Sequence, residues 1–366
     1  MRIVFCTDTL SRGGKERQMA VLTRNLLTRG HEVYWITQNW DKGNDYVDEY
    51  GIDKNRIFIV KSRSYFLGIN PIDKQISGLK PDVVMSWDIR SSFWLLVLHF
   101  LRSWTYVNGT IRHGIRNNSF QHKLRSWLVR LSPFAIANSK AGFKANKLRL
   151  KSNRCVIYNA VDPLLDLKNE RDKKRALLLS ESFKEDINFD NIVLMISVAN
   201  LVPYKDYKTV IEALSQLNIP YRYLIIGEGP QRKSIEDLIK VKGIQEKVRL
   251  LGRRKDVKEL LPLADLFLHS SKGEGCSNAI LEAISAKIPV VASEVGGTPE
   301  ILPKKSGILF TFQNAKSLKS AILLSLKIDK NSEEFRKSNR SQVQKFSNER
   351  ITDEFEEVFN KWISKK

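Results

Sequence analysis

The sequence alternates short β-rich runs with helical stretches along almost all of its 366 residues. The alternation is interrupted once, by a charged, strand-poor stretch at 166–175, and then resumes. Strand–helix–strand repeats of this kind predict parallel sheets with helices on both faces. The length favours two domains over one. The sequence therefore predicts an α/β protein made of two doubly wound, Rossmann-like domains.

The predicted elements fall into two series. Strands are expected at 2–6, 31–37, 56–60, 82–86, 105–110, 134–137 and 156–158, and again at 192–198, 221–226, 248–251, 266–269, 290–292 and 307–310. Helices are expected at 18–29, 208–216, 231–242 and from 348 to about 364. We predict a first domain at 1–170, a second at 171–345, and a terminal helix within 346–366 that packs back on the first domain.

The net charge of +21 is concentrated in the first half. Residues 1–160 hold 26 Lys and Arg against 11 Asp and Glu, and between Ile89 and Val161 there are 13 basic residues and no acidic one. Such a surface suits either nucleic acid or the anionic inner leaflet of a membrane. The segment 120–131 favours a membrane, because its apolar positions 120, 124, 127, 128 and 131 form one helical face. The alternative is a helix that buries this face in its own domain.

Targeting and redox signals are sparse. The first residues run directly into a predicted strand without a signal peptide, and no apolar run reaches the roughly 18–20 residues of a membrane span. The three cysteines, Cys6, Cys155 and Cys276, show neither metal-ligand spacing nor a disulfide framework. We expect a cytoplasmic protein.

Two glutamates flank a loop between a predicted strand and a predicted helix. Glu274 follows the apolar run 263–269 and lies between Gly273 and Gly275, whereas Glu282 lies about one turn inside the next helix. Ligands of open α/β sheets bind at the carboxyl ends of strands, where helix N-termini favour anions. Two carboxylates beside an anion site suit a nucleotide sugar. A solvated helix that happens to carry two glutamates is the alternative.

Other candidate ligand-binding residues also follow predicted strands. Gly13 and Gly14 allow backbone to approach a phosphate or sugar. Lys205 could hold a diphosphate, and His113 could polarise a hydroxyl or carbonyl. Each also has a plain structural interpretation: a tight turn, a surface lysine among many, or a structural histidine. Ser277 or Asn278 can cap the helix that carries the second glutamate.

In their order along the chain, these segments resemble family 4 of the retaining glycosyltransferases, which have the GT-B fold of two Rossmann-like domains facing a cleft. The matching segments are 13–18, 158–162, 197–205, 226–229, 274–282, 296–300 and Gly307.

The resemblance implies roles for single residues. Glu282 would bind the ribose of the donor nucleotide, Glu274 the hydroxyls of the transferred sugar, and Lys205 the diphosphate. His113 matches a histidine that such enzymes place beside the transferred sugar, and Gly14 would close over the donor. The catalytic candidates are Glu274, His113 and Lys205. The donor-binding candidates are Gly13, Gly14, Asn200, Lys205, Arg254, Glu274, Gly275, Cys276, Ser277, Asn278 and Glu282.

The chain departs from the family pattern at two points. Ala199-Asn200 stands where a Gly-Arg pair is common, and Lys205-Asp206 where Lys-Gly is common. The missing arginine removes a cation from the diphosphate site, and Arg253 or Arg254 is a candidate to replace it.

The resulting hypothesis is a metal-independent, retaining hexosyltransferase without a cofactor. It would move a sugar from a nucleotide donor, with a UDP-sugar favoured, to a lipid-linked saccharide or polysaccharide precursor at the inner face of the plasma membrane. A nucleotide-sugar 2-epimerase of the same fold is one alternative, and it needs no acceptor. A basic nucleic-acid-binding protein is another, but paired glutamates in a glycine loop argue against nucleic acid as a partner.

Overall fold

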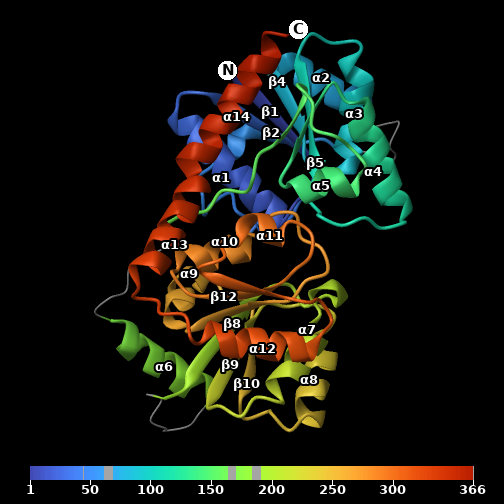
Figure 1. Cartoon of the computed structure of the whole chain (residues 1–366). Coiled ribbons are helices and arrows are strands. Elements are labelled where there is room, and N and C mark those ends of the chain that lie inside the picture. The colour runs from blue at the N-terminus through green and yellow to red at the C-terminus, as the bar shows by residue number, and fades with distance from the viewer. Residues whose placement is uncertain (44, 62–68, 164–169, 184–190, 366) are drawn as a thin grey trace. The chain divides into compact units, whose positions relative to one another are not determined.

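The computed structural model describes residues 1–43, 45–61, 69–163, 170–183 and 191–365. The chain divides into two compact units (Figure 1). Unit 1 comprises Met1–Ala160 and Phe346–Lys366, and unit 2 comprises Val161–Lys345.

Unit 1 is built on a seven-stranded parallel sheet with the strand order β3-β2-β1-β4-β5-β6-β7. Its strands are β1 (Arg2–Leu10), β2 (Glu32–Trp40), β3 (Ile57–Ile59), β4 (Val83–Ser86), β5 (Thr105–Ile111), β6 (Phe134–Ala137) and β7 (Arg154–Val156). Its helices are α1 (Gly14–Thr28), α2 (Ile69–Leu79), α3 (Ile89–His99), α4 (Phe120–Leu131), α5 (Lys140–Ala145) and α14 (Asn348–Ile363). The strand order reverses between β1 and β4, so the switch point of this sheet lies there.

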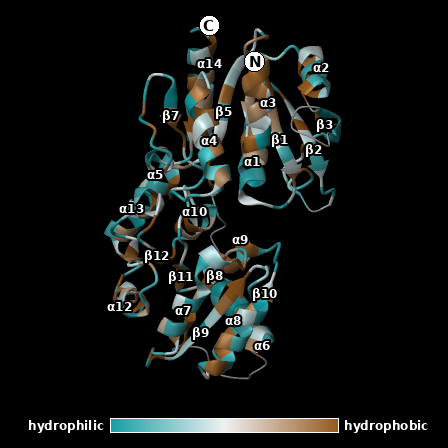
Figure 2. Ribbon diagram, turned by 90° about the vertical axis from the view of Figure 1, so that its right-hand side faces the viewer, coloured by the Kyte–Doolittle hydropathy of each residue, from teal (hydrophilic) through white to brown (hydrophobic). Residues whose placement is uncertain are grey.

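Both faces of the unit 1 sheet are covered, which explains why its strands are almost continuously apolar. Successive residues of β1 point to opposite faces. Ile3 and Phe5 belong to a core formed with α1 and α14, whereas Val4 and Cys6 belong to a second core formed with α2, α3 and α4. In Figure 2 the ribbon of α3 is largely brown, as expected of a helix made mainly of apolar residues.

Helix α14 completes the first of these cores although it comes last in the sequence. Phe355, Phe359 and Trp362 are buried there, and α14 packs along α1 (Figure 1). The Trp362 ring stacks on Phe134 with 4.7 Å between centroids, and its indole N–H donates to the carbonyl of Ser152 at 3.3 Å. The sheet of unit 1 therefore depends on the last helix for part of its cover.

Unit 2 contains a six-stranded parallel sheet with the order β10-β9-β8-β11-β12-β13. Its strands are β8 (Val193–Val198), β9 (Tyr221–Ile226), β10 (Val248–Gly252), β11 (Leu266–His269), β12 (Val290–Ser293) and β13 (Gly307–Phe310). Its helices are α6 (Arg171–Phe183), α7 (Tyr207–Leu214), α8 (Arg232–Val241), α9 (Val257–Leu260), α10 (Asn278–Ser285), α11 (Thr298–Ile301), α12 (Ala315–Ser325) and α13 (Glu333–Lys345). Its switch point lies between β8 and β11.

The two units meet in sequence between Ala160 and Val161, earlier than the boundary at 170 that the sequence suggested. The Gln18 side chain accepts a hydrogen bond from the N–H of Ala160 at 2.8 Å and donates one to its carbonyl at 2.9 Å. Both bonds fix Ala160 in unit 1. Asp162 pairs with Lys258 at 3.2 Å, and its carbonyl accepts from Ser285 at 3.1 Å. Anchors on either side of one peptide bond thus place the boundary.

Each strand of the two sheets overlaps a predicted range, and the doubly wound architecture is confirmed. Residues 166–169 of the interrupting stretch lie outside the described residues, and the rest of the stretch leads into helix α6, which begins at Arg171. Arg171 and Arg175 of this helix pair with Asp265 at 3.1 and 2.7 Å. No helix in the described ranges is long and apolar enough to cross a membrane.

Candidate functional site

The switch point of unit 2 brings together Lys205 and Glu274, which lie far apart in sequence. Lys205 ends a single 3-10 turn after β8, and Glu274 lies in the loop after β11, the neighbouring strand. The Lys205 ammonium donates to Oε1 of Glu274 and forms an ion pair with it. Lys205 is buried and Glu274 half-buried. An ion pair withdrawn from water this far is unusual for a lysine and marks a specialised position.

Backbone bonds hold the surrounding loops together. The N–H of Lys272, after β11, donates to the carbonyl of Tyr204, after β8, at 2.7 Å. The N–H of Gly297, after β12, donates to the carbonyl of Glu274 at 2.9 Å. The Ser293 hydroxyl donates to the carbonyl of Ser271 at 2.8 Å and accepts from the N–H of Ser271 at 3.0 Å. Three strand ends are thereby linked around one carboxylate.

Two glycines permit loop contacts at this edge that a side chain would block. A Cβ at Gly296, where φ is +62°, would lie 2.3 Å from the carbonyl oxygen of Glu274. A Cβ at Gly227, where φ is +144°, would lie 1.9 Å from the carbonyl oxygen of Ala199. Glycine is required here both by conformation and by close approach.

We expect Gly296→Ala to lower activity on the order of 10²-fold, because the added methyl group must displace the backbone of Glu274. Gly243→Ala is the matched control: φ is +66° there, but nothing lies within 4 Å of the added atom. Both variants carry the left-handed strain of about 1–2 kcal/mol. Equal activity of the two variants would show that the Gly296 contact does not position Glu274.

The helix that follows the loop carries the second glutamate. Ser277 occupies the N-cap position of α10, and Glu282 is buried one turn inside it. The predicted side-chain cap is wrong: Ser277 makes no capping hydrogen bond among the described residues, and Asn278 is the first helical residue. Gly275 and Cys276 are buried just before the helix. Backbone N–H groups at this helix start remain suited to an oxygen-rich ligand.

His269, the last residue of β11, directly precedes the loop and was not among the predicted site residues. Its side chain is buried, and desolvation together with the Lys205 cation lowers the pKa of His269 to about 3. The imidazole is therefore neutral at physiological pH and adds no positive charge beside Lys205. Its position at a strand end was the only signal in the sequence.

Asn200, which stands where the family often has arginine, is exposed two positions after the end of β8. Arg253 and Arg254, the candidates to replace the missing cation, are both exposed. Arg254 lies after β10 and is engaged by Asp256, with Nε donating to Oδ1 at 2.8 Å and a second bond to Oδ2. Any anion bound by Arg254 would have to compete with this bidentate partner.

Gly13 and Gly14 lie at the N-terminus of α1 in unit 1. Gly13 is the N-cap residue and provides no side-chain cap. Glu16 folds back over it, since a Cβ at position 13 would lie 2.4 Å from Oε2 of Glu16. The helix start thus already carries an anion in its first turn, which favours hydroxyl groups over phosphate at this point.

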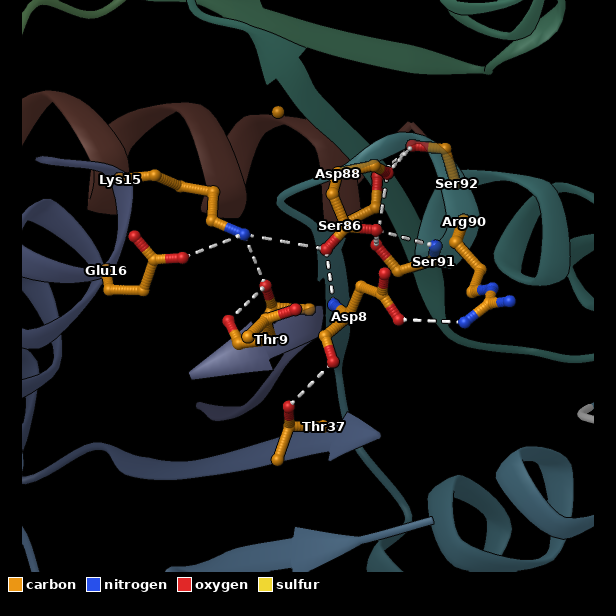
Figure 3. A network of polar contacts seen from close by, with 12 residues as sticks. Asp8, Thr9, Lys15, Glu16, Thr37, Ser86, Asp88, Arg90, Ser91 and Ser92 are labelled. Carbon is orange, nitrogen blue, oxygen red and sulfur yellow. Dashed lines mark hydrogen bonds and ion pairs between the residues drawn. The ribbon is translucent and has the colours of Figure 1, made fainter. Parts of the chain in front are cut away.

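A polar network lies close to these glycines, at the switch point of unit 1 (Figure 3). Its residues were not among the predicted site residues. Lys15 donates to Thr7 at 2.7 Å and pairs with Glu16 at 3.2 Å and Asp88 at 3.7 Å. Asp88 also accepts from the backbone N–H of Asp8 and caps α3. Thr7 and Asp8 lie in the second half of β1, Lys15 and Glu16 lie in α1, and Asp88 follows β4, so only the strand order could have revealed the cluster.

Arg90 extends the network across the sheet edge. Its guanidinium donates to Asp8 at 3.1 Å and to Gln38, at the end of β2, at 2.8 Å. The network contains two cations and three carboxylates, so its net charge is negative within a strongly basic unit. Such a cluster can bind hydroxyl groups through both donors and acceptors.

His113 lies two residues beyond β5 in unit 1 and is exposed. The structure therefore groups the candidates in two sets. Lys205, Glu274 and the loop leading to Glu282 share one edge of the unit 2 sheet, whereas Gly13, Gly14 and His113 belong to unit 1. In the described part of the chain, no three His, Cys, Asp or Glu side chains are grouped so that they could hold a metal ion.

Comparison with known proteins defines the class. The fold is that of Anabaena Alr3699/HepE, solved in complex with UDP, with a TM-score of 0.83, 19% identity and coverage of 98% of this chain and 100% of that one. This chain is 22% identical to the N-acetyl-alpha-D-glucosaminyl L-malate synthase of Bacillus anthracis over 92% of its length and 91% of the synthase.

A third relative is 24% identical over 64% of this chain and 63% of its own length. It is the N-acetylgalactosamine-N,N'-diacetylbacillosaminyl-diphospho-undecaprenol 4-alpha-N-acetylgalactosaminyltransferase of Campylobacter jejuni. The family profile described as Glycosyltransferase Family 4 matches residues 12–164, and that described as Glycosyl transferases group 1 matches residues 180–342. The protein is a glycosyltransferase of the GT-B fold, and it belongs to glycosyltransferase family 4.

Proposed function

We propose that this glycosyltransferase moves a hexose from a UDP-sugar to a lipid-linked saccharide or polysaccharide precursor at the inner face of the plasma membrane, with retention of the anomeric configuration and without a metal. The observation that carries the proposal is the Lys205–Glu274 pair at the switch point of unit 2. Ligands of open α/β sheets bind at such points.

The chemistry assigned to this edge follows from charge. Breaking the anomeric C–O bond leaves negative charge on the departing nucleoside diphosphate, and a fixed cation stabilises that charge most where water is excluded. Buried Lys205 is such a cation. Glu274 accepts hydrogen bonds from the sugar hydroxyls, and Glu282 accepts them from the ribose.

An incoming diphosphate would share Lys205 with Glu274. The carboxylate then becomes available to the sugar as the ammonium turns toward phosphate. In unit 1, we assign the network of Asp8, Lys15, Asp88 and Arg90 to the hydroxyl groups of the acceptor, and His113 to the transferred sugar.

The relatives support a nucleotide donor and a lipid acceptor. HepE was solved with UDP, and the Campylobacter enzyme is named for a diphospho-undecaprenol acceptor. The Bacillus synthase is named for L-malate, so related chains differ in their acceptors. The net negative network in unit 1 favours a neutral sugar hydroxyl over a hydroxy acid.

The proposal is tested by incubating the protein with UDP-glucose, UDP-galactose, UDP-N-acetylglucosamine and UDP-N-acetylgalactosamine, together with bacterial lipid extract, and measuring UDP release. We expect acceptor-dependent release from one donor, unchanged by EDTA, and a product with the donor's anomeric configuration by NMR. An inverted product or EDTA-sensitive release would contradict the assigned mechanism. A C2 epimer formed from the donor alone would instead identify an epimerase.

A further inference from the structure

Large apolar side chains are exposed on one part of unit 1, where α3 and α4 pack against each other. Phe120, at the start of α4, is 78% exposed, and Phe100, directly after α3, is 77% exposed. The exposed apolar residues in this part of the chain are Val97, Phe100, Leu101, Phe120, Trp127, Leu131 and Leu150. We call this set the α3–α4 patch. Isolated exposed apolar residues are ordinary, but several of them on and beside two helices that pack against each other are a candidate interaction surface.

The structure divides the apolar residues of α4 in a way that the sequence did not show. The predicted single face contained five apolar positions. Two of them face the core: Leu128 is buried in the core shared with α2 and α3, and partly buried Leu124 packs against that core. Phe120, Trp127 and Leu131 lie outside, on a stripe with a spacing of seven and four residues. The helix therefore satisfies the core with one side and still presents an apolar stripe to its surroundings.

Helix α3 contributes to the patch for a related reason. Its segment Phe93–Leu98 has no polar residue. These six residues span more than one helical turn, so even the side of the helix that faces solvent is apolar there. Trp94, Leu95 and Leu98 are buried, which leaves Val97 outside. The chain then continues with exposed Phe100 and Leu101.

The charge of this part of the chain indicates the chemistry of the partner. Residues 89–161 contain 13 Lys and Arg and no Asp or Glu. Of these, Arg102 is neutralised by Asp73 from α2. Basic residues that are exposed on α4 and on the segment after it are Lys123, Arg130, Lys140, Lys144, Lys147, Arg149 and Lys151. Aromatic and aliphatic side chains among lysines and arginines fit a bilayer interface with anionic lipids.

We infer that the α3–α4 patch inserts into the headgroup region of an anionic membrane, with Phe100, Phe120 and Trp127 as its anchors and the surrounding basic residues on the lipid phosphates. This inference rests on the proposed function, since a lipid-linked acceptor is presented at that interface. Nucleic acid would use the charge but not the apolar anchors. A second copy of the chain would use the anchors but meet the same positive charge.

The inference is tested with the full chain in flotation assays on vesicles of phosphatidylcholine alone or mixed with phosphatidylglycerol. We expect binding to the mixed vesicles only, and at least about tenfold weaker binding by Phe100→Ser/Phe120→Ser/Trp127→Ser. The matched control is Val241→Ser/Leu324→Ser, which removes exposed apolar residues from unit 2 and should bind as the parent does. At about 1 M salt, the parent's binding to the mixed vesicles should fall to the level seen with phosphatidylcholine alone, because the attraction to the lipid phosphates is screened.

Several results would overturn the inference. They are unchanged vesicle binding by the triple variant, binding to an oligonucleotide but not to vesicles, and a dimer in solution that the triple variant disperses. Thermal stabilisation by UDP is measured on the same samples. If vesicle binding fails but UDP still stabilises the protein, the membrane inference fails and the donor site stands. If the protein binds vesicles but transfers no sugar, the proposed function fails and the membrane inference stands.

Discussion

Replacing Lys205 with alanine is expected to lower the turnover of sugar transfer by about 10²- to 10³-fold, the usual cost of removing one group that stabilises transition-state charge. The expected loss is larger in kcat than in KM for the donor, because the diphosphate gains charge as the anomeric bond breaks. The measurement is steady-state UDP release with the UDP-sugar that supports acceptor-dependent release. Unchanged turnover would remove Lys205 from this role.

The structure supplies the controls for this substitution. Lys208 is exposed on α7, three residues away, and Lys208→Ala should leave turnover unchanged. Removal of Lys205 also deprives half-buried Glu274 of its ion-pair partner, which costs stability in its own right. The double variant Lys205→Ala/Glu274→Gln removes that unpaired charge. If it regains thermal stability, the stability loss of Lys205→Ala comes from the unpaired Glu274 carboxylate. Turnover is compared only among the parent, Lys205→Ala and Lys208→Ala, because Glu274 is itself assigned to the sugar.

Substitution of Glu282 is expected to abolish most of the thermal stabilisation by the preferred nucleotide. At a ligand concentration of about 100 Kd, binding stabilises a protein by roughly 2.7 kcal/mol. For a unit of this size, that corresponds to a rise in Tm of roughly 5–10 °C. Hydrogen bonds to a charged acceptor contribute about 1.5–3 kcal/mol. Glu282→Ala should therefore lose most of the shift.

The experiment compares UDP, GDP and ADP on the parent, Glu282→Ala, the near-isosteric Glu282→Gln, and Glu294→Gln as the control. Glu294 is an exposed carboxylate just after β12 in the same unit. We expect a shift with UDP that Glu294→Gln preserves. A full shift in Glu282→Ala would place the nucleotide away from α10, and a shift with GDP in place of UDP would change the assigned donor.

The strands were predictable because strands covered on both faces are short apolar runs between turn residues. Helix α6 was not, because Arg171 and Arg175 use its charged side for ion pairs with Asp265. A charged helix of this kind carries little amphipathic signal. The boundary at Ala160 was also hidden, since it depends on Gln18 far away in sequence.

The candidate site was predictable only as separate segments. The sequence indicated that Lys205 and Glu274 each follow a strand, but their pairing required the knowledge that β8 and β11 are neighbours. Asp8 and Asp88 were missed for the same reason, because β1 and β4 are neighbours although 80 positions separate these two aspartates. Strand order is set by tertiary packing, which a single sequence does not reveal.

The position of α14 has a consequence for how the chain folds as it is synthesised. Unit 2 is one continuous segment, whereas unit 1 needs Phe346–Lys366 to cover its sheet. Unit 2 can therefore fold on the ribosome before Phe346–Lys366 is made, but unit 1 must keep Phe134 and its neighbours uncovered until that segment is available. The order of folding is thus reversed from the usual N-terminal-first sequence. A chaperone that binds exposed apolar surface would find it in the half of the nascent chain that was made first.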